Sequence, residues 1–232
     1  MVKKMSLNKL LKEPFLVLGA IFSVTTIVLV TILVLSVTGG KSSIDNDVNT
    51  NIGITDNTEE VVDYILRDSA TDYQKQVFEE LTAAQESFED SWTPETESAY
   101  AEAVVKNFIA DFYTWSNKLG RNDVGGLQFV YPLYRTDFRN KAVDVFYLYL
   151  DYYIEEYGAD ELLTVTDVKV TGVDTNYVYT MPDGTQLDGT YVYVEWAYDD
   201  SQELDLSKFP TETGFVVVEK DNQLVLIEIQ EW

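Results

Sequence analysis

The feature that most constrains this chain is an unbroken apolar stretch near its N-terminus. Residues Phe15–Val37 contain no charged side chain, and sixteen of these 23 residues are Leu, Ile, Val or Phe. As an α-helix the stretch would be about 34 Å long, enough to cross the roughly 30 Å hydrocarbon core of a bilayer. We therefore predict a transmembrane helix over residues 15–37.

The charges on either side of this stretch predict its orientation. Residues 1–40 carry four lysines and one glutamate, whereas residues 41–232 carry 12 basic and 39 acidic residues. Under the positive-inside rule the tail at residues 1–14 is cytoplasmic and the rest is extracytoplasmic. A cleaved signal peptide is the alternative, but signal peptides have apolar regions of only about 7–15 residues that end at small residues. We predict a single-pass protein of the cell membrane.

The composition excludes several kinds of chemistry. The 232-residue chain has neither cysteine nor histidine, so it cannot form disulfides, thiolate zinc sites or histidine-dependent catalytic triads. A net charge of −24 repels the phosphates of nucleic acids. No sequence motif for catalysis is present. We therefore predict protein partners, with no nucleic acid, no cofactor, no metal site and no enzymatic activity.

The region after the apolar stretch predicts a linker and then short helices. Residues 38–58 are rich in Gly, Ser, Asn and Asp and lack periodicity, which is typical of a flexible linker. Capping-box patterns at residues 57–60 and 71–74 begin two helices within residues 59–92. The second helix has apolar residues at helical spacing, namely Tyr73, Val77, Leu81, Ala84 and Phe88. This region is either a helical hairpin packed on its own domain or a membrane-proximal stalk for self-association.

Residues 93–232 predict an α+β domain. A helix expected over Thr93–Leu119 begins with an N-cap and a first-turn proline and ends before a glycine. A second helix is expected over residues 136–157, with an unusually wide apolar band. Beyond these helices the sequence becomes β-branched and aromatic, which is typical of strands. Strands are expected at 165–173, 177–180, 191–198, 215–220 and 224–232, with turns at 182–184, 188–189 and 221–222. This order predicts helices packed on a curved antiparallel sheet.

The same order resembles the nuclear-transport-factor-2-like superfamily, in which helices fill the concave side of a bent sheet to form a cone. The resemblance covers about Thr93 to Trp232 and includes the break at Gly125-Gly126, the aromatic helix Asp137–Tyr157 and a closing hairpin at 214–229. With the anchor added, the layout resembles bitopic inner-membrane subunits of type IV secretion and conjugation machines. It is also similar to uncharacterised anchored proteins of Gram-positive bacteria. These resemblances imply a role in assembly, although the extra helices at 59–90 depart from the pattern.

Two groups of residues are candidates for function. Superfamily enzymes place acids, bases and aromatics inside the cone, which implies a pocket near the following residues: Tyr113, Trp115, Tyr131, Asp137 and Tyr149. The alternative is that these aromatics are ordinary core residues and that Asp137 only complements a helix dipole. Exposed tyrosine and tryptophan are typical of protein interfaces, which makes the strand aromatics a candidate interaction face: Tyr177, Tyr179, Tyr191, Tyr193, Trp196 and Tyr198.

The sequence therefore favours a membrane-anchored extracytoplasmic scaffold in a secretion, conjugation or cell-envelope assembly. A small-ligand-binding or enzymatic cone is the alternative.

Overall fold

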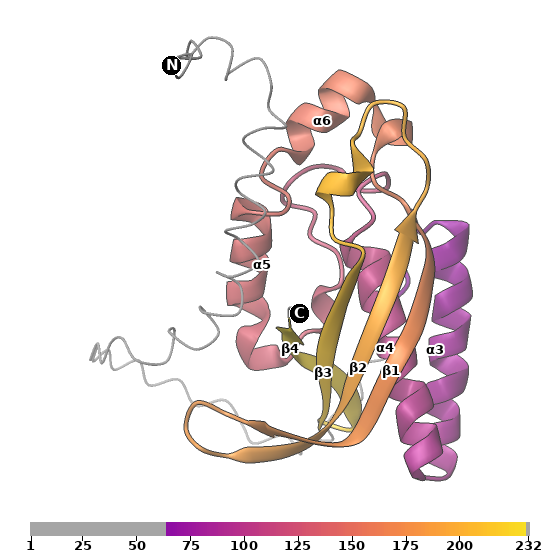
Figure 1. Ribbon diagram of the computed structural model, residues 1–232, viewed down its shortest axis with the longest axis vertical. Coiled ribbons are helices and arrows are strands. Elements are labelled where there is room, and N and C mark those ends of the chain that lie inside the picture. The colour runs from indigo at the N-terminus through magenta and orange to yellow at the C-terminus, as the bar shows by residue number, and fades with distance from the viewer. Residues whose placement is uncertain (1–63, 231–232) are drawn as a thin grey trace, which may run out of the picture.

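The computed structural model of the protein describes residues 64–230, which form an α+β arrangement of four helices and one four-stranded sheet (Figure 1). The helices are α3 Asp72–Asp90, α4 Pro94–Phe112, α5 Arg135–Asp144 and α6 Leu150–Tyr157, and the strands are β1 Val165–Thr180, β2 Gln186–Tyr198, β3 Glu212–Lys220 and β4 Gln223–Gln230. Short 3-10 turns lie at Leu127–Phe129, Pro132–Tyr134, Ala159–Glu161 and Leu206–Lys208. Within this part of the chain, no helix has both the length and the apolarity that a membrane crossing requires. The predicted membrane helix at 15–37 and the linker at 38–58 lie outside the described residues.

Helices α3 and α4 form a hairpin whose N-termini follow the predicted capping signals. Thr71 caps α3 and exchanges hydrogen bonds with Gln74, and Thr93 caps α4 in the same way. The buried side chain of Asn107 on α4 then donates to the Val77 carbonyl of α3 at 2.6 Å. Residues 72–90 therefore pack on the domain's own α4, and their role in self-association stays a prediction.

The chain enters this domain through a short segment that is pinned by hydrogen bonds. Residues 64–67 are not helical, so the prediction that the first short helix extends through them is wrong. The reason is that the backbone of Ile65 pairs with the side chain of Gln128, through bonds of 2.7 and 2.8 Å. The hydroxyl of Tyr64 also donates to the Leu224 carbonyl at 2.7 Å. The two bonds with Gln128 satisfy the N–H and C=O groups of Ile65, which a helix would have paired internally.

Helix α4 ends at Phe112, well before its predicted end at Leu119. The backbone N–H groups of Trp115 and Ser116 donate to the Leu163 carbonyl, at 2.7 and 3.1 Å. Leu163 lies just before β1, so the chain leaves the helix in order to join the start of the sheet. Tertiary hydrogen bonds have here overridden local helix propensity.

The single helix predicted over residues 136–157 is two helices in the structure, α5 and α6. The break begins at Val145, whose φ of −124° and ψ of −78° are not helical. It turns two aromatic side chains inward: the Phe146 ring stacks on that of Phe112 at 5.1 Å, and the Tyr147 hydroxyl donates to the Phe112 carbonyl at 2.5 Å. The wide apolar band is therefore divided between two helix directions.

The strands form one antiparallel sheet in the order β1-β2-β3-β4. The two strands predicted at 165–173 and 177–180 are a single strand, β1, with a register shift between Asp174 and Tyr177. Such an irregularity increases the local twist and bend of a strand. The β1–β2 hairpin does bend sharply at its far end (Figure 1).

Two of the three predicted turns are confirmed. Gly184, with φ of +88°, lies in the turn between β1 and β2, and Asp221–Asn222, with φ of 53° and 62°, join β3 to β4 as a two-residue hairpin loop. The turn predicted at Asp188–Gly189 is wrong, because both residues lie within β2. A Cβ atom at Gly189 would lie 2.8 Å from the Val217 carbonyl oxygen. This glycine therefore permits a close approach of β2 to β3.

The sheet has apolar side chains on both faces. Helices α3 and α4 lie along one face (Figure 1), where the rings of Phe108 and Phe215 meet edge to face at 5.6 Å in the main core. The opposite face carries a second cluster of four buried side chains, namely Val216, Val218, Val225 and Ile227.

Candidate functional site: a tyrosine face on the curved sheet

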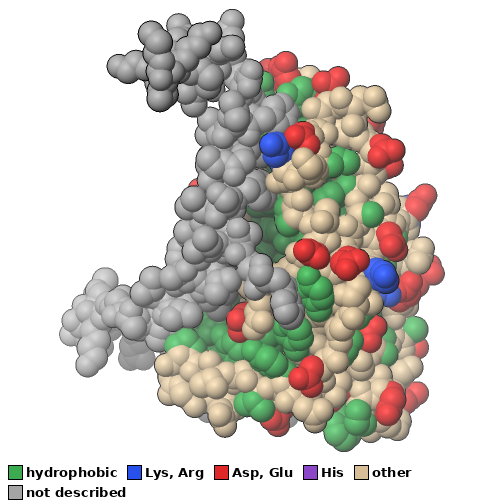
Figure 2. Space-filling view, viewed as in Figure 1, with side chains coloured by type: hydrophobic (Ala, Val, Ile, Leu, Met, Phe, Trp, Pro, Cys, Tyr) green, Lys and Arg blue, Asp and Glu red, His purple; other side chains and the backbone are tan. Residues whose placement is uncertain are grey.

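Five tyrosines surround the second apolar cluster, and we call them together the tyrosine face. They come from the turn before α5 and from strands β1 and β2: Tyr131, Tyr134, Tyr177, Tyr179 and Tyr191. All five are half-buried against the aliphatic cluster. In the space-filling view, apolar side chains, tyrosine included, gather above the bent hairpin with acidic side chains among and around them (Figure 2).

Strand alternation divides the six candidates for the predicted interaction face. Tyr191 and Tyr193 project from β2 on the same side as the second cluster, because residues two apart in a strand share a face. Trp196 and Tyr198 have the opposite parity and pack into the main core, where Trp196 is only 5% exposed. Tyr177 and Tyr179 of β1 join the second cluster.

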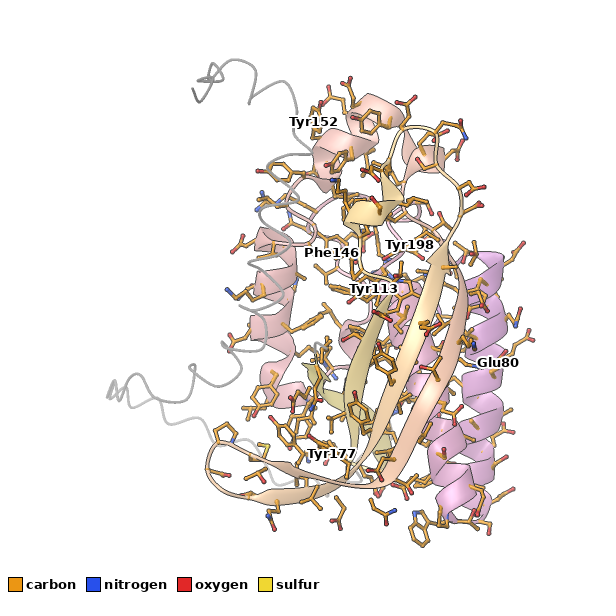
Figure 3. All side chains as sticks on the ribbon, in the orientation of Figure 1. Glu80, Tyr113, Phe146, Tyr152, Tyr177 and Tyr198 are labelled. Carbon is orange, nitrogen blue, oxygen red and sulfur yellow. The ribbon has the colours of Figure 1, made fainter. Side chains whose placement is uncertain are left out.

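The five candidates for the predicted pocket do not come together. Tyr113 and Trp115 are buried in the main core, where the Tyr113 ring lies 4.7 Å from that of Trp196. In the side-chain view, Tyr113 lies close to Phe146 and Tyr198 in the interior, far from Tyr177 at the bend (Figure 3). The remaining three candidates lie in separate places: Tyr131 belongs to the tyrosine face, while Asp137 on α5 and Tyr149 before α6 are exposed.

A hydrogen bond between the two outer strands marks the concave side of the sheet. Gln230 Nε2 on β4 donates to the Tyr177 hydroxyl on β1 at 3.0 Å. These are the two outer strands of the sheet, which in a flat sheet would lie about 14 Å apart at about 4.8 Å per strand. The side chains meet because β1 bends toward β4, and Tyr177 lies on the inner side of that bend (Figure 3). The tyrosine face therefore lies on the concave side of the bent sheet, and we call this concave side the hollow.

Ring packing orders the tyrosines within this hollow. The rings of Tyr177 and Tyr191 lie 5.7 Å apart at an interplanar angle of 30°, and those of Tyr131 and Tyr134 lie 5.7 Å apart at 40°. Tyr191 lies over Gly214 of β3, where a Cβ atom would come within 2.6 Å of the ring's Cζ. Glycine is thus the residue that leaves room for this ring.

Glu228 is the carboxylate on the tyrosine face. It lies opposite Val216 in the β3–β4 register, and residues directly opposite one another in a sheet share a face. Burial raises the pKa of Glu228, while a hydrogen bond from Gln230 opposes this rise. Burial also raises the pKa of Tyr179 to about 12, with contributions from neighbouring groups that include Glu228. Glu228 pairs with no cation among the described residues.

Sequence reasoning missed Tyr134, Glu228 and Gln230. The available signal was that Glu228 interrupts an apolar run, Leu224–Ile229, in a strand that is otherwise buried. Its place on the second face also depends on the register shift opposite Val216 and Val217. That shift is a tertiary feature with no local sequence mark.

A cluster of charged side chains lies beside Arg67, in the segment through which the chain enters the domain. Asp111 at the end of α4 accepts from Arg67 Nε at 3.1 Å, from Lys118 Nζ at 2.9 Å and from the Gly126 backbone at 2.7 Å. Arg67 also pairs with Asp123 at 2.8 Å. Burial lowers the pKa of Lys118, and Asp111 opposes that effect. Because these two cations and two carboxylates pair with one another, the cluster holds the entry segment in place.

Residues 64–230 contain no group of three or more carboxylates arranged to hold a metal ion. Comparison of the chain with protein-family models, with curated proteins and with solved structures gave no match. What the structure itself defines is an α+β domain whose sheet has one concave face lined by tyrosines. The resemblances to the nuclear-transport-factor-2-like superfamily and to secretion subunits stay predictions.

Proposed function

We propose that this protein is a single-pass membrane protein that presents an extracytoplasmic α+β domain as a scaffold, and that the tyrosine face is its contact surface for protein partners. The apolar stretch at 15–37 and the charge asymmetry around it support the anchor and its orientation. The role in a secretion, conjugation or envelope assembly follows from the resemblance in layout.

One observation carries the proposal for the contact surface: five half-buried tyrosines gather on the concave face of the sheet. Tyrosine is enriched at protein interfaces because it adds a large apolar area and a polar tip at a low cost in side-chain entropy. The two candidate tryptophans, Trp115 and Trp196, are instead buried in the main core. The tyrosine face, in contrast, keeps part of each ring accessible to a partner.

Co-purification of the full-length protein from native membranes tests this proposal. The test variant combines Tyr177→Ser and Tyr179→Ser, and the matched control is Tyr152→Ser, which removes a 46% exposed tyrosine from α6. We expect the double variant to lose a partner that the wild type and the control retain. Urea unfolding must show that the double variant still folds. Retention of every partner by a folded double variant would reject the tyrosine face as the contact surface.

The alternative is a small-ligand or enzymatic site in the same hollow. The observation that favours it is the half-buried Glu228, since a carboxyl group with a raised pKa among phenols can serve as an acid or base. This alternative predicts that Glu228→Gln abolishes biological function while every protein partner still co-purifies. The scaffold proposal predicts that function and co-purification are lost together.

A further inference from the structure

The charges around the tyrosine face are mostly negative. Asp174 lies directly opposite Tyr191 in the β1–β2 register and so shares its face, and Asp183 lies in the turn of the same hairpin. Glu195 lies directly opposite Lys169, and residues 170–194 between them and the turn contain no lysine or arginine. Glu228 adds a carboxylate on the face itself. The nearest cation in sequence is Arg135, whose Nη2 donates to the Gln128 and Val130 carbonyls at 3.3 and 3.2 Å. That guanidinium is engaged by these two backbone carbonyls.

Phenol rings and a carboxylate together form a specific kind of receptor. The face of a tyrosine ring attracts cations, and the attraction strengthens when water is excluded. A partly desolvated carboxylate gains more from a cation than an exposed one does, because removal of water strengthens the charge interaction. Gln230 connects the phenol rings with the carboxylate, since its side chain donates to the Tyr177 hydroxyl and also bonds Glu228.

We infer that the tyrosine face receives a basic segment of a partner protein, with a lysine or arginine side chain placed against the Tyr177–Tyr191 ring pair and the Glu228 carboxylate. This inference rests on the proposed function and names the chemistry of the partner. The aliphatic floor at Val216, Val218, Val225 and Ile227 adds a requirement for apolar residues beside the cation. Charge complementarity with this acidic face excludes an acidic segment as the occupant.

A binding titration of the full-length protein in a non-ionic detergent tests the inference. The probe is a short synthetic peptide of alternating lysine and valine, and a peptide with glutamate in place of lysine is its control. We compare the wild type with Glu228→Gln and with Glu86→Gln, which removes an exposed carboxylate from α3. Both variants lose the same formal charge, so only the position of the charge differs between them.

We expect the basic peptide to bind the wild type and Glu86→Gln equally and to bind Glu228→Gln about tenfold more weakly, the effect of losing one charge-assisted contact of roughly 1.4 kcal/mol. The acidic peptide should not bind.

A second pair of variants tests the rings: Tyr191→Phe keeps an aromatic face and should retain binding, whereas Tyr191→Leu should weaken it.

Two results would overturn the inference. Equal weakening by Glu228→Gln and Glu86→Gln would mean that the peptide only senses the overall negative charge. No binding of the basic peptide to a folded wild type would mean that the partner has another chemistry. In that second case the co-purification experiment with Tyr177 and Tyr179 can still succeed, so failure of this inference is distinguishable from failure of the proposed function.

Discussion

Replacement of Gly214 by alanine should disturb the tyrosine face without unfolding the domain. The added Cβ would collide with the Tyr191 hydroxyl oxygen and would lie 2.6 Å from Cζ and 2.8 Å from Cε2 of the same ring, whereas carbon atoms in favourable contact are about 3.5–4.0 Å apart. The Tyr191 ring must therefore shift by about 1 Å. Because Tyr191 pairs with Tyr177 at 5.7 Å, the shift should also weaken this ring pair.

The cost can be worked from these contacts. Overpacking typically costs about 1–3 kcal/mol, and loss of an aromatic pair costs about 0.5–1.5 kcal/mol. The reduced entropy of the unfolded chain returns about 0.4–1 kcal/mol. We therefore expect Gly214→Ala to lower the free energy of unfolding by about 1–3 kcal/mol. The matched control is Gly172→Ala on β1, whose Cβ would lie an ordinary 3.7 Å from Tyr193 Cβ.

Urea unfolding and near-ultraviolet circular dichroism provide the assay. The control Gly172→Ala should be unchanged or slightly more stable, with the tyrosine signal of the wild type. Gly214→Ala should be less stable and should show an altered tyrosine signal, because the ring that the glycine accommodates has moved. Equal stability and identical spectra for the two variants would refute the placement of Tyr191 over Gly214.

Three further predictions concern buried polar groups. Tyr147→Phe should lower the free energy of unfolding by about 1–3 kcal/mol, because it leaves the buried Phe112 carbonyl without the Tyr147 hydroxyl. Tyr153→Phe, the matched control, should be neutral or stabilising, since the buried Tyr153 hydroxyl bonds to no other described group; urea unfolding of both variants measures the difference. Asp111→Asn should cost about 3–5 kcal/mol by the same measurement, because it leaves the fully buried Lys118 ammonium without its carboxylate. A loss below about 1 kcal/mol would contradict the buried pairing of Asp111 with Lys118. Glu228 faces Tyr179 and Gln230 and has a raised pKa in the folded state, so its favourable contribution is present at low pH and is lost as the pH rises through the folded pKa. Unfolding at acidic and neutral pH should therefore show Glu228→Gln gaining stability relative to wild type as the pH rises, and no change in the difference would contradict this.

The features that the sequence predicts well are local ones. The N-caps at Thr71 and Thr93 are set by side chains that bond a backbone group three residues away, so a short pattern contains the whole interaction. The Asp221–Asn222 turn is predictable for the same reason, since both residue types tolerate positive φ. That helices come first and strands follow is predictable from the change in hydrophobic periodicity along the chain.

The features that the sequence does not predict depend on distant contacts. Nothing in the residues around Val145 marks a helix break, which exists because Phe146 and Tyr147 pack against Phe112. Helix α4 ends early because Leu163, distant in sequence, accepts the hydrogen bonds that follow it.

The same limitation applies to the candidate site. Strand periodicity could have separated Tyr191 and Tyr193 from Trp196 and Tyr198, because the first two differ in parity from the second two. The meeting of Tyr177 with Gln230 could not have been foreseen, because it depends on the bend that brings the outer strands together. The tyrosine face thus combines Tyr131, predicted for the pocket, with three tyrosines predicted for the interaction surface and with Tyr134, which was predicted for neither.

Site-specific photocrosslinking in native membranes tests the central claim most directly. A benzophenone side chain is introduced in place of Tyr179 on the tyrosine face and, in a second protein, in place of exposed Glu86 on α3. The account predicts a discrete crosslinked partner from position 179 and none from position 86. Crosslinks of equal yield at the two positions, or a partner trapped only from α3, would contradict the account.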